Sequence, residues 1–221
     1  MLVSFREEFH EAFPASADAG LFRCVSQALV MASELMEHES FLNSLIGNDI
    51  RGHIRRAAVL FNVHSACKAG DLPFFAEMGK MPLGGGHWVE LTSGNFRAHI
   101  YRTDGPEIFP ADTPTKQNSR LSNQFNLSFD DDSKVISIPS LRKTYEAWLT
   151  FGANGRELSH LCWGMPEAKR NTWLDRINII RRLGTAPAEQ EAKPTNAVRL
   201  RFKEHIEEAL RSGDTEVNRS S

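Results

Sequence analysis

Residues 145–163 read YEAWLTFGANGRELSHLCW, two β-prone runs on either side of Asn154-Gly155. Asn-Gly is the strongest short-range hairpin signal, because both residues tolerate the positive φ angles of a type I′ turn. The register that this turn predicts pairs Phe151 with Leu158, Leu149 with His160, and Trp148 with Leu161. Both faces of the hairpin are substantially apolar, so we expect it to lie centrally in a sheet or between two layers.

A second hairpin is predicted earlier in the chain, where the runs 87–91 and 96–102 flank Gly94-Asn95. This loop places Glu90 directly across from His99, and alternation sorts the side chains into two faces. The apolar face, which we expect to join the core, holds Val89, Leu91, Ala98 and Ile100. The opposite face is aromatic and ionisable and holds Trp88, Glu90, Thr92, Arg97, His99 and Tyr101.

Helical periodicity fills the region before the hairpins. Apolar residues recur at helical spacing over 21–35, which predicts a first helix. We expect Gly47-Asn48-Asp49 to separate it from a second helix that ends at Gly70. A short third helix is predicted over 71–79.

Three later segments are less regular. Residues 103–134 are rich in proline and polar residues and predict a long connection, a kind of segment that is often functional or mobile. Residues 135–138 predict a short strand. Residues 173–183 suit either a helix or an edge strand, since their apolar residues fit both the helical period and the alternation of a strand.

Together these elements predict an α+β fold, with N-terminal helices packed on an antiparallel, hairpin-rich sheet of about four to six strands. We expect residues 1–183 to form this single domain. Residues 184–196 lack large apolar side chains and contain two prolines, which is typical of a linker. A C-terminal amphipathic helix is predicted over 197–212, and the polar tail 213–221 is expected to be disordered.

The composition is that of a folded globular protein, with 41% hydrophobic and 24% charged residues. The N-terminus lacks the features of a secretory signal, and no apolar run approaches the ~20 residues that cross a bilayer. We interpret Cys24, Cys67 and Cys162 as buried thiols rather than a disulfide or a metal site. A soluble, cytoplasmic protein with no membrane partner is therefore expected.

The net charge of −2 argues against a strongly basic nucleic-acid binder, but it hides an asymmetry. Residues 1–50 carry 2 Lys/Arg and 8 Asp/Glu, whereas residues 51–120 carry 9 and 6. Arg51, Arg55 and Arg56 form a basic segment on the predicted second helix. They could position phosphate groups, or form salt bridges with the acidic first helix.

Motifs with strong catalytic mechanisms are absent from the sequence. Gly84-Gly85-Gly86 lacks the Lys and Ser/Thr of a Walker loop, so we interpret it as a flexible entry into a strand. Gly-x-Ser-x-Gly, His-Glu-x-x-His and Cys-x-x-Cys motifs do not occur. We therefore expect no cofactor, and we interpret His64 and His160 as hydrogen-bonded core histidines.

The remaining candidates have low specificity. Glu90 across from His99 is either an acid–base couple or a polar pair that contributes ~0.2–1 kcal/mol to the sheet. The neighbouring rings, beside Arg97, would suit stacking on a base or a ring ligand. The run Asp130-Asp131-Asp132 is either part of a magnesium site or, as we favour, a solvated turn.

We therefore expect a non-catalytic binding or accessory module for a protein or anionic partner. Its candidate binding residues are Trp88, Glu90, Arg97, His99, Tyr101, Arg51, Arg55 and Arg56. A protein partner would bind the helix over 197–212, and an anionic or nucleic-acid partner would bind the charged residues. The alternative is a metal-dependent hydrolase or nuclease that uses Glu90, His99 and Asp130–Asp132.

Overall fold

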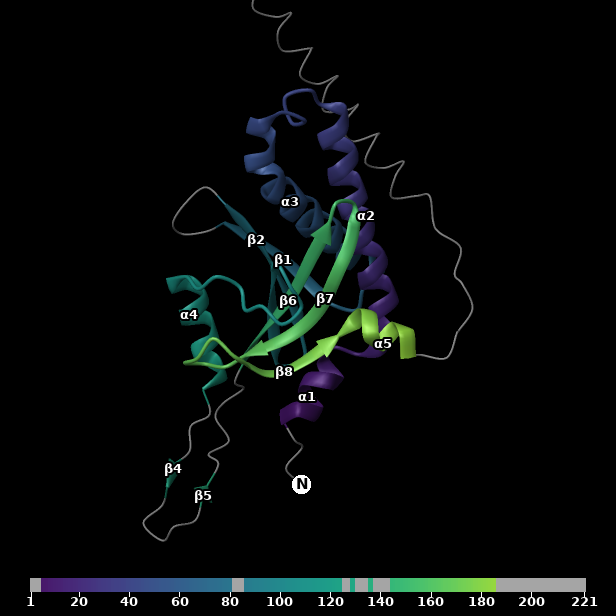
Figure 1. Ribbon diagram of the computed structural model, residues 1–221. Coiled ribbons are helices and arrows are strands. Elements are labelled where there is room, and N and C mark those ends of the chain that lie inside the picture. The colour runs from purple at the N-terminus through teal and green to yellow at the C-terminus, as the bar shows by residue number, and fades with distance from the viewer. Residues whose placement is uncertain (1–4, 81–85, 125–127, 130–134, 137–143, 186–221) are drawn as a thin grey trace, which may run out of the picture. The chain divides into compact units, whose positions relative to one another are not determined.

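The computed structural model describes residues 5–80, 86–124, 128–129, 135–136 and 144–185. All of them belong to one unit, Met1–Thr185. The predicted helix over 197–212, the tail 213–221, the run Asp130–Asp132 and most of the expected linker lie outside the described residues. Figure 1 shows helices packed against a twisted β-sheet.

Within the described residues, six strands form one sheet in the order β1-β2-β3-β6-β7-β8. The strands are β1 (Phe75–Lys80), β2 (His87–Ser93), β3 (Phe96–Arg102), β6 (Tyr145–Asn154), β7 (Glu157–Pro166) and β8 (Trp173–Asn178). Neighbours are antiparallel except for β3 and β6, which are parallel. The short strands β4 (Ser128–Phe129) and β5 (Val135–Ile136) pair only with each other among the described residues. This mostly antiparallel sheet confirms the predicted α+β class.

The helices come mainly before the sheet. They are α1 (Phe5–Ala12), α2 (Asp18–His38), α3 (Leu45–Ala69), α4 (Pro114–Arg120) and α5 (Ile179–Thr185), with the 3-10 turns η1 (Ala15–Ala17) and η2 (Leu121–Asn123). The ambiguous segment 173–183 forms both predicted structures in succession, an edge strand, β8, and then α5. The expected connection over 103–134 is not structureless, because it contains α4 and η2.

The predicted helix break at Gly47-Asn48-Asp49 is wrong, because α2 and α3 are separated by residues 39–44. The Ser44 hydroxyl accepts a hydrogen bond from the Gly47 N–H at 3.2 Å and so caps α3. Gly47 itself lies in the first turn, where a Cβ would overlap the backbone of Leu42. A glycine required for close backbone packing therefore looked like a chain break.

The third helix predicted over 71–79 is also wrong. α3 ends at Gly70, which has φ +79° and serves as the expected left-handed cap. The following residues turn and then form β1, which pairs with β2 along its whole length. Backbone pairing with a neighbouring strand decided this segment, because local helix preference is too weak to resist it.

The hairpin around Gly94-Asn95 is confirmed with its register. Glu90 lies opposite His99, and Gly94 has φ +55° in the turn. The predicted apolar face is at most 1% exposed and consists of Val89, Leu91, Ala98 and Ile100. Alternation therefore assigned both faces of this hairpin correctly.

The hairpin of β6 and β7 is confirmed, but its predicted register is wrong. Asn154 pairs with Glu157, so the loop residues are Gly155 and Arg156 rather than Asn154 and Gly155. A bulge between Gly152 and Ala153 then shifts the register once more. The observed pairs are Phe151 with Leu161, Leu149 with Trp163, and Trp148 with Gly164.

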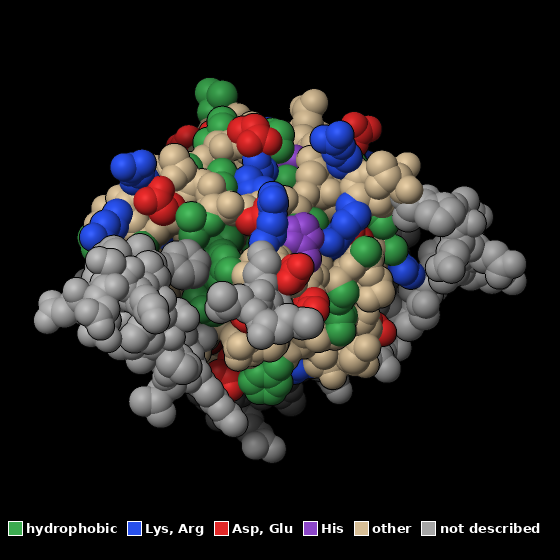
Figure 2. Space-filling model, turned by 90° about the horizontal axis from the view of Figure 1, so that it is seen from below, with side chains coloured by type: hydrophobic (Ala, Val, Ile, Leu, Met, Phe, Trp, Pro, Cys, Tyr) green, Lys and Arg blue, Asp and Glu red, His purple; other side chains and the backbone are tan. Residues whose placement is uncertain are grey.

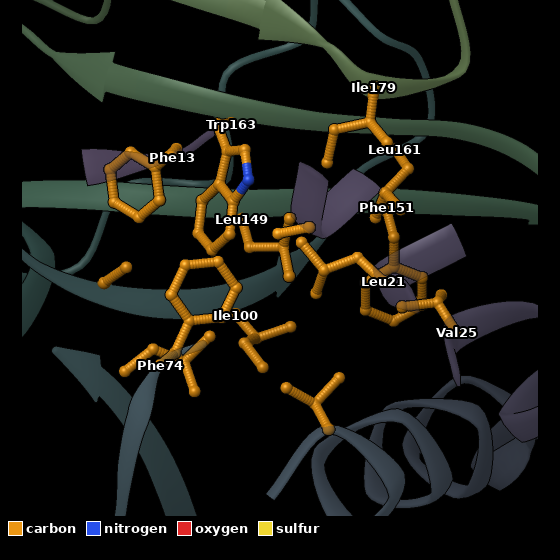
Figure 3. Close-up of a cluster of buried hydrophobic side chains, with 14 of the residues drawn as sticks. Phe13, Leu21, Val25, Phe74, Ile100, Leu149, Phe151, Leu161, Trp163 and Ile179 are labelled. Carbon is orange, nitrogen blue, oxygen red and sulfur yellow. The ribbon is translucent and has the colours of Figure 1, made fainter. Parts of the chain in front are cut away.

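Leu149 and Trp163 join the core that the helices cover. Figure 3 shows Trp163 beside Phe13, with Leu21 and Val25 of α2 on the same side of the sheet as Ile100 and Leu149. The Phe13 and Trp163 rings stack with centroids 4.1 Å apart. The core therefore forms where the strands β3, β6 and β7 meet the N-terminal helices.

His160 is a hydrogen-bonded core histidine, as predicted. It is 3% exposed, and its Nε2 lies 2.8 Å from the Thr103 hydroxyl. Burial, reinforced by the charge of Arg176, lowers the pKa of this imidazole and favours its neutral form. His64, in contrast, is only half-buried, so the same prediction for it is wrong.

The cysteines are free thiols, but they are not all buried. Cys24 and Cys162 are buried, whereas Cys67 is half-buried. Burial raises the pKa of Cys24 to about 12 and that of Cys67 to about 11. Neither thiol is therefore activated as a nucleophile at neutral pH.

We expect Gly152→Ala to destabilise the domain. A Cβ at this position would overlap the His160 ring, which contacts the hydroxyls of Thr103 and Ser159. Because the ring cannot shift without losing these bonds, we expect the free energy of unfolding to fall by about 1–3 kcal/mol in urea denaturation. The control Gly184→Ala, where a Cβ meets nothing within 4 Å, should change it by less than about 0.5 kcal/mol. Equal effects of the two substitutions would contradict this account.

Candidate functional site

The polar face of the first hairpin converges on a buried carboxylate, Glu146, which the sequence did not suggest. Glu146 is fully buried on β6, next to β3. Its carboxylate accepts hydrogen bonds from Arg97 Nε (3.1 Å) and Trp148 Nε1 (3.0 Å). His99 Nδ1 lies 2.7 Å from the same group, and His99 Nε2 lies 3.4 Å from Glu90. Arg97 and His99 thus belong to one network centred on Glu146.

Asn123 of η2 holds the backbone beneath this network. Its side-chain oxygen accepts a hydrogen bond from the Glu146 N–H at 2.7 Å. Its amide nitrogen donates to the carbonyl oxygens of Glu146 and Pro166, at 2.9 and 2.8 Å. These bonds tie the 103–124 segment to β6 and β7, so the network stabilises the contact between the connection and the sheet.

The aromatic residues of the polar face do not form an open stacking platform. The Trp88 ring packs edge-on against His99, with centroids 5.6 Å apart. The Lys116 ammonium lies over the Tyr101 ring at 4.6 Å from its centroid. Burial, and next the charge of Glu146, raises the pKa of the Tyr101 hydroxyl. Both rings are therefore occupied by protein contacts.

The predicted basic residues lie at the end of the sheet where β3 finishes and β2 starts. Arg55 donates a hydrogen bond to the Gly155 carbonyl at 2.8 Å, and Arg56 donates one to the His87 carbonyl at 3.3 Å. Arg102, at the end of β3, approaches α3 so closely that a Cβ on Gly52 would lie 2.8 Å from its guanidinium. We call the resulting group, which spans α3, β3 and α4, the basic cluster. Its members are Arg51, Arg55, Arg56, Arg102 and Lys116.

Electrostatic effects within the basic cluster confirm that its members are neighbours. Burial lowers the pKa of Arg55 most, and the charges of Arg51 and Arg102 lower it further. The pKa of Lys116 is lowered by burial and by Arg56, against the opposing effect of Asp112. The Nε atoms of Arg51 and Arg55 are buried without a hydrogen-bond partner among the described residues. Like charges are thus held together at a free-energy cost.

Carboxylates act on two members of the basic cluster. Asp104 lies 3.5 Å from Arg102, and the charge of Asp112 acts on Lys116. Two acidic residues of α2 form ion pairs with arginines outside the basic cluster. Asp18 pairs with Arg182, and Glu37 pairs with Arg156. Salt bridges between Arg51, Arg55 or Arg56 and the other acidic residues of the first helix stay a prediction.

The opposite end of the unit, where α1 lies, has a different charge pattern. Figure 2 shows acidic and basic side chains interspersed there. Asp175 receives hydrogen bonds from Arg6 at 3.0 and 3.2 Å and lies 3.0 Å from His10 Nε2. Burial raises the pKa of Asp175, but its hydrogen bonds, above all that from Arg6, bring it below its usual value. Asp175, Arg6 and His10 thus form one group of paired charges at this end.

Comparison with protein-family models, curated proteins and solved structures finds no match to this chain. The site must therefore be judged from its own geometry.

That geometry gives no metal centre in the part of the chain that the structure describes. No group of three or more His, Cys, Asp or Glu side chains there is arranged to hold an ion. Glu90 and His99 do meet, as predicted, but Asp130–Asp132 lie outside the described residues. The helices that the structure describes are also too short or too polar to cross a membrane.

Sequence reasoning found three members of the basic cluster and missed two, Arg102 and Lys116. It also missed Glu146 and Asn123 in the polar network. All four depend on the parallel pairing of β3 with β6 and on the path of the 103–124 segment. No short-range sequence signal reports such contacts, so only the tertiary structure could reveal them.

Proposed function

We propose that this protein is a non-catalytic binding module whose basic cluster binds the phosphate backbone of a nucleic acid. The observation that carries the proposal is the grouping of Arg51, Arg55, Arg56, Arg102 and Lys116 at one end of the sheet, where neighbouring arginines lower the pKa of both Arg55 and Lys116. Folding holds these like charges together at a cost, and an anion would relieve it. The two unpartnered guanidinium Nε atoms favour the same ligand class.

Phosphate fits this cluster better than an isolated carboxylate does. Arginine presents a planar fork of donors that can bind two phosphate oxygens at once, and four of the five cations are arginines. Backbone contacts of this kind carry no base information. We therefore expect weak, sequence-independent and strongly salt-dependent binding, with a Kd on the order of 10⁻⁴ to 10⁻⁶ M at physiological salt.

The triple substitution Arg51→Ala, Arg55→Ala and Arg56→Ala should weaken nucleic-acid binding at least tenfold at 50 mM salt. Each lost phosphate contact should also reduce the slope of log K against log salt by about 0.7–0.9, so the triple variant should lose about two to three units of slope. Fluorescence anisotropy of labelled single-stranded RNA and duplex DNA measures both quantities. Thermal melting of each variant checks folding, because Arg55 and Arg56 also bond backbone carbonyls.

The matched control removes the same charge elsewhere, through Arg23→Ala, Lys169→Ala and Arg170→Ala at exposed positions. If the basic cluster is the site, this control variant should change the Kd by less than about twofold. That small change would come from the loss of net positive charge alone. Absence of wild-type binding at low salt would overturn the proposal. Binding to polyglutamate but not to nucleic acid would assign the cluster to an acidic protein partner instead.

The alternative of a metal-dependent hydrolase stays a prediction, and the same samples can test it. The contact between Glu90 and His99 supports it, but the third component, Asp130–Asp132, lies outside the described residues. Incubation of the nucleic acids with protein and Mg²⁺ or Mn²⁺ would reveal cleavage on a gel. The role of residues 197–212 as a protein-binding arm likewise stays a prediction.

A further inference from the structure

Two exposed side chains, those of Lys80 and His87, lie at the same end of the sheet as the basic cluster. Lys80 is the last residue of β1, and His87 is the first residue of β2. The two residues lie directly opposite each other in this antiparallel pair of strands. Opposite residues point to the same face of a sheet, with Cβ atoms about 4.5–5.5 Å apart. Lys80 and His87 therefore form an adjacent pair of hydrogen-bond donors.

Helix α3 connects this pair with the basic cluster. Figure 1 shows α3 beside the end of the sheet, where Arg56 donates a hydrogen bond to the His87 carbonyl oxygen at 3.3 Å. One helical turn earlier, a Cβ on Gly52 would lie 2.8 Å from the Arg102 guanidinium. Four helical residues span about 6 Å, so Arg102 and His87 meet α3 about one turn apart. We call Arg102, His87 and Lys80, at the ends of β3, β2 and β1, the strand-end row.

The strand-end row lies on the same side of the sheet as α3. His87 is two residues before Val89, so both side chains point to the same face of β2. Val89 is 1% exposed and belongs to the same hydrophobic core as Val59 of α3. Arg102 is likewise two residues after the core residue Ile100. The cations of α3 and those at the strand ends can therefore contact one ligand.

We propose that Lys80 and His87 bind the same phosphate backbone as the basic cluster, at the phosphates that follow those held by Arg56. This inference rests on the proposed function, because it extends the same binding surface. Lysine and histidine side chains both donate hydrogen bonds, and the phosphate oxygens of a nucleic acid accept them.

The length of the strand-end row defines the kind of ligand. One helical turn plus one strand spacing gives about 11 Å. A nucleic-acid strand in a duplex rises about 3.4 Å per nucleotide, so the row has the length of about three nucleotides. A chain of consecutive phosphates, supplied by a single strand or by one strand of a duplex, fits this surface better than a single phosphate group does.

Lys80→Ala tests the strand-end row without removing a buried contact, because Lys80 is exposed. Loss of one phosphate contact should reduce the slope of log K against log salt by about 0.7–0.9 and raise the Kd about tenfold at 50 mM salt. Fluorescence anisotropy of the full chain with labelled single-stranded RNA and duplex DNA measures both quantities. Lys68→Ala is the matched control, because it removes the same charge from an exposed position near the other end of α3. It should change the Kd by less than about twofold.

His87→Ala gives a second test at the neighbouring strand. The substitution removes the imidazole but keeps the backbone carbonyl that Arg56 bonds. Loss of one hydrogen bond to phosphate should raise the Kd about two- to tenfold. Thermal melting of each variant checks that the fold is retained.

The outcomes separate the strand-end row from the basic cluster. Absence of wild-type binding at low salt would overturn both proposals. If the triple arginine substitution weakens binding but Lys80→Ala and His87→Ala behave like Lys68→Ala, the basic cluster stands and the strand-end row is not part of the site. Weaker binding of both nucleic acids by Lys80→Ala would support contact with one backbone in either form. Weaker binding of only one of them would identify the form that the row binds.

Discussion

Replacing Glu146 with alanine is expected to lower the free energy of unfolding by about 3 kcal/mol, and the melting temperature by about 6–12 °C. The carboxylate is fully buried and is bonded by Arg97, Trp148 and His99. Its removal leaves donors in a poorly solvated space without an acceptor, which costs more than the bonds themselves contributed. Arg97 is partly exposed and can reach water after the substitution. The fall in the free energy of unfolding should therefore lie at the lower end of the range for a broken buried charge network.

Two further variants make this expectation specific. Glu146→Gln keeps the shape and one acceptor oxygen, so we expect a smaller loss of about 1–2 kcal/mol. Glu157→Ala removes an exposed carboxylate from the neighbouring strand and should change stability by less than about 0.5 kcal/mol. A Glu146→Ala variant as stable as the wild type would show that the network is not structural. That result would make Glu146 a candidate for proton transfer beside His99 and Glu90.

Trp163→Ala is expected to be the most destabilising of the substitutions considered, at about 3–5 kcal/mol. Trp163 is fully buried on β7, stacks on Phe13 and meets the edge of Phe74 at 5.6 Å between centroids. Alanine would lose this apolar contact and leave a cavity between α1, the β1 region and the sheet. Urea denaturation followed by far-ultraviolet circular dichroism measures the loss.

Phe75→Ala is the control, because it removes an aromatic ring that is exposed rather than buried in the core. Phe75 is 64% exposed on the edge strand β1, so its loss should cost less than about 0.5 kcal/mol. Trp163→Phe, which keeps a ring against Phe13, should cost less than Trp163→Ala. If the exposed and the buried substitutions had equal effects, the core assigned around Trp163 would be wrong.

The network at Glu146 and the basic cluster differ in how far their polar groups are hydrogen-bonded. The network at Glu146 is satisfied from within, because its donors and acceptor are all supplied by β3, β6 and their neighbours. The basic cluster is not, because Arg51 and Arg55 keep unpartnered nitrogen atoms among the described residues. Unsatisfied charge that folding brings together is the better guide to a binding site.

Local patterns predicted the elements that depend on short-range order. The hairpin at Gly94-Asn95 was predicted with its register, because a two-residue loop and strict alternation leave one way to bury Val89 and Leu91. The helical stripe from Leu21 to Ala32 was also predicted, because α2 buries one apolar face, although Leu35, the last predicted member, is exposed. Both rest on interactions between residues close in the chain.

Predictions failed where a neighbouring segment made the decision. Gly47 looked like a helix break but is a small residue against the Leu42 backbone, and residues 75–79 became a strand because β2 lies alongside. The β6–β7 register differs because the loop is Gly155-Arg156 rather than Asn154-Gly155, and because a bulge at Gly152, beside the buried His160 ring, shifts it once more. None of these contacts is encoded by periodicity within the segment itself.

By itself, the sequence determined the α+β class, the hairpins and the basic character of the α3 segment. Those features follow from side-chain alternation, turn residues and local charge, which act over a few residues. Only the tertiary structure decided that Glu146 would bond Arg97 and His99, and that Arg102 and Lys116 would complete the basic cluster. The physical reason is the parallel pairing of β3 and β6, which joins segments separated by more than forty residues and has no local signature.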